Sequence, residues 1–140
     1  MNDTLVTLVG HVATRIDFKD ASPGVTATSP SARFRFAVTP RYFDRRTDTW
    51  TDAPTSFYTV WARRALALNL ASSVAVGEPL VVHGRLRVRE DPPDGEGVRW
   101  FSADIDAIAV GHDLNRGTAA FRRMVKADTS LMSPQNAAVV

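Results

Sequence analysis

Five side chains of this 140-residue chain could ligate a metal or transfer protons, namely His11, His83, His112, Asp104 and Asp106. Their spacing fits no known ligand pattern, and each histidine is explained more simply as a residue of a strand or of the surface. The chain has no cysteine, which excludes a disulfide and a thiolate metal site. The sequence therefore predicts no catalytic residue, no metal site and no cofactor, and the protein is not expected to be an enzyme.

A different chemistry is carried by residues 57–63, whose aromatic and β-branched composition is typical of a strand. Alternation along this strand places Phe57, Thr59, Trp61 and Arg63 on one face. Aromatic rings beside an arginine suit a surface that stacks flat rings and neutralises phosphates. The alternative is that Phe57 and Trp61 are core residues and that Arg63 only marks the end of the strand.

Arginines are concentrated between residues 33 and 89, where ten arginines and four acidic residues give 10 − 4 = +6, against +2 for the whole chain. A guanidinium group binds phosphate bidentately and stacks on bases, which lysine does poorly. No acidic residue separates the outward arginines of two alternating segments, so these segments predict a positive groove lined by Arg33, Arg35, Arg85, Arg87 and Arg89. The alternatives are a solvated strand face and an arginine content set by codon usage.

The elements that must position these side chains follow a simple order. Strands are predicted at residues 4–16, 31–39, 57–63, 80–89 and 98–110. Apolar residues recur at i, i+4 and i+8 within residues 64–75, which predicts a helix between the third and fourth strands. This order predicts an all-β chain, the five-stranded Greek-key barrel called the OB-fold, with one helix between strands 3 and 4.

The connections and the ends of the chain complete the prediction. The connection at 40–55 is long and carries Tyr42, Phe43 and Trp50, aromatic residues that are costly to expose without a role. Residues 1–112 are expected to form the binding domain, and residues 113–140 a C-terminal extension with a short helix at 114–124 and then a flexible tail. No signal peptide or membrane-spanning segment is evident, so a cytoplasmic protein is expected.

Several short segments resemble the bacterial single-stranded DNA-binding proteins, in the same order and at similar spacing. They are Leu8-Val9-Gly10, Phe36-Ala37-Val38, the helix segment from Arg64 to Ala71, and Val81-Val82-His83-Gly84-Arg85-Leu86. The segment from Asp113 to Ala119 resembles actinobacterial members. The resemblance spans residues 4–110 and implies an OB-fold that binds single-stranded DNA in replication, recombination or repair, in the cytoplasm and on the nucleoid, as a homotetramer.

In that family bases stack on strand aromatics, and the matching positions here are Tyr42, Phe57, Trp61 and Trp100. Arg63 replaces a family aromatic, and its guanidinium plane can still stack on a base. Many members end in an acidic tip that recruits repair proteins. This chain ends without an acidic residue at 133–140, so recruitment by that route is not expected.

Residues and resemblance together predict sequence-tolerant binding of single-stranded DNA, with stacking on aromatics and arginine contacts to phosphates. The alternative is an OB-fold adaptor or oligomerisation module with little DNA binding, because a fold alone does not decide function. The residues predicted to contact DNA are Arg33, Arg35, Tyr42, Trp50, Phe57, Trp61, Arg63, Arg85, Arg87, Arg89 and Trp100.

Overall fold

The computed structural model describes residues 2–22 and 28–125 of the chain. The expected flexible tail from residue 127 lies outside the described residues. Within them, strands dominate and one α-helix, α1 (Arg64–Ser73), lies between the third and fourth long strands, as predicted. No helix in this part of the chain is long and apolar enough to cross a membrane.

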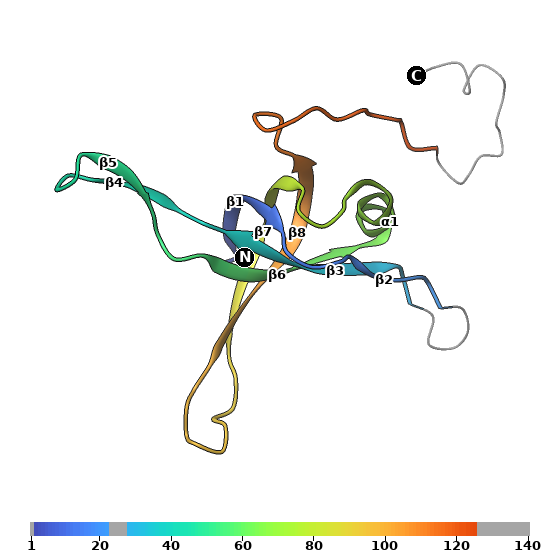
Figure 1. Cartoon of the computed structure of the whole chain (residues 1–140). Coiled ribbons are helices and arrows are strands. Elements are labelled where there is room, and N and C mark those ends of the chain that lie inside the picture. Colours follow the sequence, from blue (N-terminus) through green and yellow to red (C-terminus); the bar gives the residue numbers. More distant parts are fainter. Residues whose placement is uncertain (1, 23–27, 126–140) are drawn as a thin grey trace.

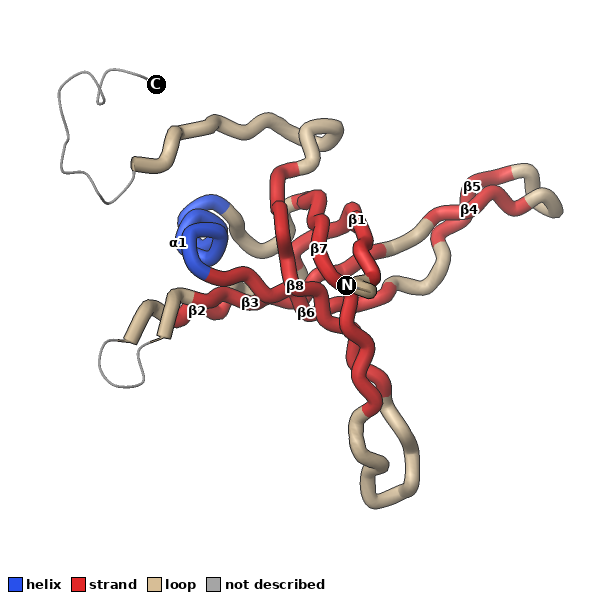
Figure 2. Tube along the Cα trace, turned by 180° about the vertical axis from the view of Figure 1, so that it is seen from behind, coloured by secondary structure: helices blue, strands red, loops and turns tan. Residues whose placement is uncertain are grey.

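The long strands form a closed ring, as shown in Figure 1 and from behind in Figure 2. They are β1 (Thr4–Val12), β3 (Ser31–Val38), β6 (Ser56–Arg63), β7 (Pro79–Glu90) and β8 (Phe101–His112). The sheet order is β1-β7-β8-β6-β3, and β1 also pairs with β3, which closes the ring. A short strand, β2 (Asp17–Lys19), extends the sheet beside β3. The prediction of an OB-fold is confirmed.

The inside of the ring is filled by the apolar residues of the alternating strands. Phe34, Phe36 and Val60 are almost completely buried, while their neighbours along β3 and β6 face outward. Ala67 and Leu70 of α1 pack into the same core cluster, so the helix covers one end of the ring. The residues that alternate along β3 and β6 in the sequence therefore point by turns into the core and out to the surface.

Two glycines allow strands to approach closely. A Cβ atom on Gly10 would lie 2.3 Å from the backbone oxygen of Ala37, and one on Gly84 would lie 2.3 Å from that of Asp106. The pairing of β1 with β7 continues in register through Gly10. The pairing of β7 with β8 has a register shift between His83 and Gly84.

Two hairpins project from the ring (Figure 1). The connection at 40–55 forms a separate ribbon of β4 (Arg41–Asp44) and β5 (Thr49–Asp52), and the other projection is the far end of β7 and β8 with its loop. β8 begins at Phe101, so the strand expected from residue 98 starts three residues later. The short helix expected at 114–124 is absent, because residues 114–125 adopt turns and irregular backbone.

Candidate nucleic-acid interface

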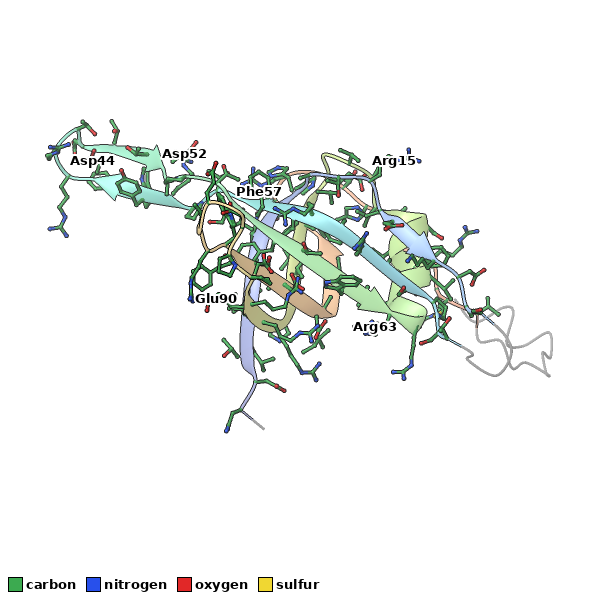
Figure 3. All side chains as sticks on the ribbon, turned by 90° about the horizontal axis from the view of Figure 1, so that it is seen from below. Arg15, Asp44, Asp52, Phe57, Arg63 and Glu90 are labelled. Atoms are coloured by element: carbon green, nitrogen blue, oxygen red, sulfur yellow. The ribbon has the colours of Figure 1, made fainter. Side chains whose placement is uncertain are left out.

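The outer surface of four neighbouring strands carries most of the residues predicted to contact DNA. We call this surface the binding face and define it by the outward residues of β3, β6, β8 and β7, which are Arg33, Arg35, Phe57, Thr59, Trp61, Arg63, Asp104, Asp106, Arg85, Arg87 and Arg89. In Figure 3, Phe57 and Arg63 lie near opposite ends of β6, which runs along this face.

The strand register arranges the binding face in two rows that cross the sheet. Arg35, Thr59, Asp104 and Arg87 are successive partners in one row. The next row contains Arg33, Trp61, Asp106 and Arg85. Partners on adjacent strands are close enough for their side chains to touch. Each row therefore has an arginine at either end, with a hydroxyl or an aromatic ring and a carboxylate between them.

Two arginines of β3 lie over the aromatic rings of β6. The guanidinium carbon of Arg33 is 5.4 Å from the ring centroid of Trp61, and that of Arg35 is 5.6 Å from the ring centroid of Phe57. Arg35 also donates a hydrogen bond from Nη1 to the hydroxyl of Thr59, at 3.2 Å. These are cation–π distances.

The two aromatic residues differ in burial. Phe57 is 49% exposed, so the alternative that made it a core residue is wrong. Trp61 is partly buried, and its Nε1 atom has no hydrogen-bond partner among the described residues.

The positive groove is largely neutralised, which the sequence did not predict. Arg87 Nη2 is 3.0 Å from Asp106 Oδ1, Arg63 Nη2 is 3.9 Å from the same oxygen, and Arg89 Nη2 is 3.5 Å from Asp104 Oδ2. No acidic residue lies between Arg85 and Arg89 of β7, as the sequence shows, but β8 lies between β6 and β7 and supplies Asp104 and Asp106.

Of the three remaining outward arginines, two have a carboxylate partner outside β8 and one has none. Arg33 Nε is 3.0 Å from Asp17 Oδ2, and Arg85 Nε is 3.1 Å from Asp3 Oδ2. Arg35 is the exception on this face, because no carboxylate of the described residues lies within 4 Å of its charged group.

Two surface clefts flank the aromatic residues of β6. One has a volume of about 300 Å³ and is lined by Trp61, Arg63, Arg87, Arg89 and Asp104. The other has a volume of about 340 Å³ and is lined by Thr14, Arg15, Asp17, Arg33, Phe34, Arg35 and Thr59. Charged side chains line both clefts, around Trp61 in the first and beside Thr59 in the second.

Sequence reasoning missed several residues that line these clefts or lie on the binding face. Arg15 and Asp17 follow β1 in a segment without clear alternation, so nothing in the sequence placed them beside β3. Asp104 and Asp106 alternate with Ile105 in β8, a pattern that could have marked them as outward residues. The sequence instead offered them as metal ligands.

The aromatic residues of the β4–β5 hairpin lie away from the ring strands. The hairpin register pairs Tyr42 with Thr51 and Phe43 with Trp50, so Tyr42 and Trp50 lie on opposite faces of the ribbon. The rings of Phe43 and Trp50 meet edge to face, with centroids 5.7 Å apart. The structure therefore does not bring Tyr42 and Trp50 together, although both are exposed. Figure 3 shows Asp44 and Asp52 on this projection, beyond the end of β6 marked by Phe57.

Trp100 lies in the loop before β8 rather than on the binding face. It is 60% exposed, and its Nε1 atom donates to Asp94 Oδ2 at 3.4 Å. The backbone amides of Val98 and Glu96 also donate to Asp94, and these hydrogen bonds hold the pKa of Asp94 below its ordinary value. Asp94 thus organises the loop that carries Trp100.

The histidines have separate surroundings. His83 Nδ1 is 2.8 Å from Thr7 Oγ1, and His112 Nε2 is 3.0 Å from Glu78 Oε1. The hydrogen bond with His112, followed by one from the Ala75 amide, lowers the pKa of Glu78. Within residues 2–22 and 28–125, no cluster of three or more His, Cys, Asp or Glu residues could hold a metal ion.

Comparison with known proteins agrees with this geometry. The family model described as "Single-strand binding protein family" matches residues 3–112. A protein named single-stranded DNA-binding protein 1 from Streptomyces coelicolor is 53% identical over 135 residues, which cover 96% of this chain and 82% of the relative. Single-stranded DNA-binding protein 2 from Streptomyces avermitilis is 55% identical over 123 residues, 88% of this chain and 73% of the relative.

Solved structures show the same fold. The crystal structure of a small single-stranded DNA-binding protein from Streptomyces coelicolor matches with a TM-score of 0.69 and 52% identity, covering 84% of this chain and all of that one. The second single-stranded DNA-binding protein from Mycobacterium smegmatis matches with a TM-score of 0.54 at 22% identity, covering 86% and 99%. That second likeness concerns the fold alone. The chain therefore belongs to the single-strand binding protein family, a family of non-enzymatic binding proteins.

Proposed function

We propose that the protein binds single-stranded DNA without strong sequence preference, through the binding face. The observation that carries this proposal is the pairing of Arg33 with Trp61 and of Arg35 with Phe57 on one outward surface between two charged clefts. Every base has a flat face that can stack on an aromatic ring, and every phosphate can accept from a guanidinium group. In a duplex the bases are stacked on one another and are not available to these rings.

Tyr42 and Trp50 extend the proposed contact along the β4–β5 hairpin, and Trp100 extends it onto the β7–β8 loop. About half or more of the surface of each side chain is exposed, and none of the three belongs to the core. These residues lie on projections, so we infer that they contact DNA only where the strand runs beyond the ring. Residues 1–112 form the DNA-binding domain in this proposal, and residues 113–140 are its extension.

The function is tested by tryptophan fluorescence, because Trp61 lies on the binding face, and Trp50 and Trp100 lie on the two projections that the proposed contact includes. Oligothymidine is titrated into the full chain at low and high salt, with a duplex of equal length as the control. We expect quenching by the single strand alone and weaker binding as salt rises. If neither fluorescence nor a direct binding assay detects the single strand, an OB-fold adaptor function is favoured instead.

We also infer that the protein assembles as a homo-oligomer, a homotetramer by analogy with the family, and that it acts on the nucleoid in replication, recombination or repair. Support for assembly comes from Leu5 and Val9, two exposed apolar residues on the outer face of β1. Light scattering coupled to size-exclusion chromatography tests the assembly, and a monomeric mass at micromolar concentration would contradict it.

A further inference from the structure

Two carboxylates of β8 occupy the centre of the binding face. β8 pairs with β6 on one side and with β7 on the other, so Asp104 and Asp106 lie between the aromatic residues of β6 and the arginines of β7. Aspartate is short and arginine is long, so the carboxylates lie low on this surface while the guanidinium groups of β7 extend over them. The cleft that contains Trp61 and Arg63 is lined by Asp104 as well.

The surroundings of these carboxylates show that the arginines cover them. Asp104 belongs to the outer surface of the ring, yet it is only 7% exposed. Asp106 contacts two arginines at once, with Oδ1 at 3.0 Å from Arg87 and 3.9 Å from Arg63. A carboxylate removed from water is costly unless cations compensate it, so these contacts stabilise the arginines in one arrangement.

We propose that Asp104 and Asp106 are internal competitors of DNA phosphate. This inference rests on the proposed function. In the free protein the two carboxylates hold Arg63, Arg87 and Arg89, the groups that a DNA backbone must contact, and phosphates exchange for the carboxylates when the strand binds. Asp104 and Asp106 therefore lower the affinity of the face for polyanions in general.

This competition determines specificity. Phosphates are common to single strands and duplexes, whereas only an unpaired strand offers bases to Phe57 and Trp61. A duplex offers the face only phosphates, and these must displace carboxylates, so the duplex gains little binding free energy. A single strand also gains the stacking energy of its bases. The carboxylates thus make stacking necessary for tight binding.

The competition also changes the salt dependence. When Arg87 leaves Asp106 and neutralises a phosphate, the DNA releases a condensed cation, but the uncovered carboxylate attracts a cation in its turn, so the net release of salt ions is small. Arg35 has no such carboxylate among the described residues, so the cation released by its phosphate is not taken up again. The two kinds of arginine are therefore distinguishable by experiment.

The test replaces Asp106 by asparagine, which has nearly the same shape and no charge. We expect Asp106→Asn to bind oligothymidine about two- to fivefold more tightly near 0.1 M salt, the range expected for loss of one or two exposed ion pairs. The slope of log affinity against log salt should steepen by roughly 0.7 for each arginine released. Duplex binding should rise by a larger factor than single-strand binding, so the preference for single strands should fall.

Asp20→Asn is the matched control, because Asp20 is exposed, loses the same charge and lies outside the binding face. It should change affinity and slope less than Asp106→Asn does. In a chain that also carries Arg63→Ala and Arg87→Ala, the effect of Asp106→Asn should disappear, because its partners are gone. A merely structural role for Asp106 would not make its effect depend on these arginines.

Several results would overturn the proposal. Unchanged or weaker binding by a folded Asp106→Asn would show that the carboxylate positions the arginines without competing. If that variant does not fold, the salt slopes of Arg87→Ala and Arg35→Ala decide: equal reductions in slope contradict the proposal, and a smaller reduction for Arg87→Ala supports it. The proposed function itself fails only if the wild-type chain does not bind oligothymidine, so the two failures are distinguishable.

Discussion

The guanidinium group of Arg33 lies over the indole ring of Trp61, with 5.4 Å between the guanidinium carbon and the ring centroid. The two residues are direct partners in the antiparallel register of β3 and β6. Arg35 makes a similar contact with Phe57 at 5.6 Å, but diagonally, because its direct partner in the register is Thr59. Each aromatic ring thus already contacts a phosphate-binding guanidinium group before DNA binds. This lowers the entropic cost of bringing the ring and the guanidinium group together.

Removal of either ring should weaken single-strand binding. We expect Trp61→Ala and Phe57→Ala each to lose about 1–3 kcal/mol of binding free energy, the usual contribution of one base stacked on an aromatic side chain. The salt slope should change little, because neither ring carries charge. Titration with oligothymidine at several salt concentrations measures both quantities.

Phe121→Ala serves as the control for the ring variants, because Phe121 is exposed and lies after β8, outside the binding face. Its affinity should equal that of the wild type. Phe57→Ala should also leave the protein folded, since Phe57 is about half exposed. Equal loss of binding in Phe57→Ala and Phe121→Ala would contradict the position of the interface.

Arg35 should make the clearest contribution to salt dependence. Arg35→Ala removes a guanidinium group that has no carboxylate partner among the described residues, so the salt slope should become shallower by roughly 0.7. Arg35→Lys keeps the charge and should restore the slope, but it loses the planar contact with Phe57 and should recover only part of the affinity. A slope that stays at the wild-type value in Arg35→Ala would show that no phosphate binds there.

The close approach at Gly84 predicts a stability effect that is independent of DNA. A Cβ atom there would lie 2.3 Å from the Asp106 backbone oxygen and 2.9 Å from the Ala107 Cα atom, so the strands must separate. We expect Gly84→Ala to lower the free energy of unfolding by about 1–3 kcal/mol or more. Gly111→Ala is the matched control in β8, because nothing lies within 4 Å of its added Cβ. Urea unfolding measures the stability of both variants, and equal midpoints would refute this account.

Glu78 predicts a dependence of stability on acid. Its pKa is lowered chiefly by the hydrogen bond with His112, and then by the Ala75 amide. A carboxylate with a lowered pKa in the folded state stabilises the protein above the ordinary glutamate value of about 4.3 and loses that contribution as the pH falls below it. Glu78→Gln should therefore be less stable than wild type at pH 7, and the difference should shrink at pH 3.5. Urea unfolding at both values measures the change, and a constant difference would contradict the assignment.

Much of the fold could be predicted because local pattern and tertiary burial agree. Phe34 and Phe36 alternate with Arg33 and Arg35, and the ring places the first pair inside and the second outside. The same agreement assigned Trp61 and Phe57 to an outward face. Leu114 to Met124 were wrongly predicted as a helix, because their few apolar residues have no core to pack against, and packing supplies most of the stability of a short helix.

The ion pairs of the interface could not be predicted from any single segment. Asp106 is 19 residues from Arg87 and 43 from Arg63, and it meets both only because β8 is inserted between β6 and β7. No turn residue or spacing in the sequence indicates that β6 and β8 pair in parallel. Trp100 illustrates the opposite case: its residue type suggested the interface, while its loop turned it toward Asp94.

The position of β8 in the ring also has a consequence for how the protein folds. β8 is the last strand of the described chain, yet it forms the junction between β6 and β7, and β1 pairs with β7 across most of the sequence. A nascent chain that ends before residue 101 has unpaired edges on both β6 and β7, edges that can recruit strands of other chains. Closure by such distant pairings is intrinsically slow. The barrel thus completes late in synthesis, and chains interrupted before β8 are the ones most exposed to aggregation.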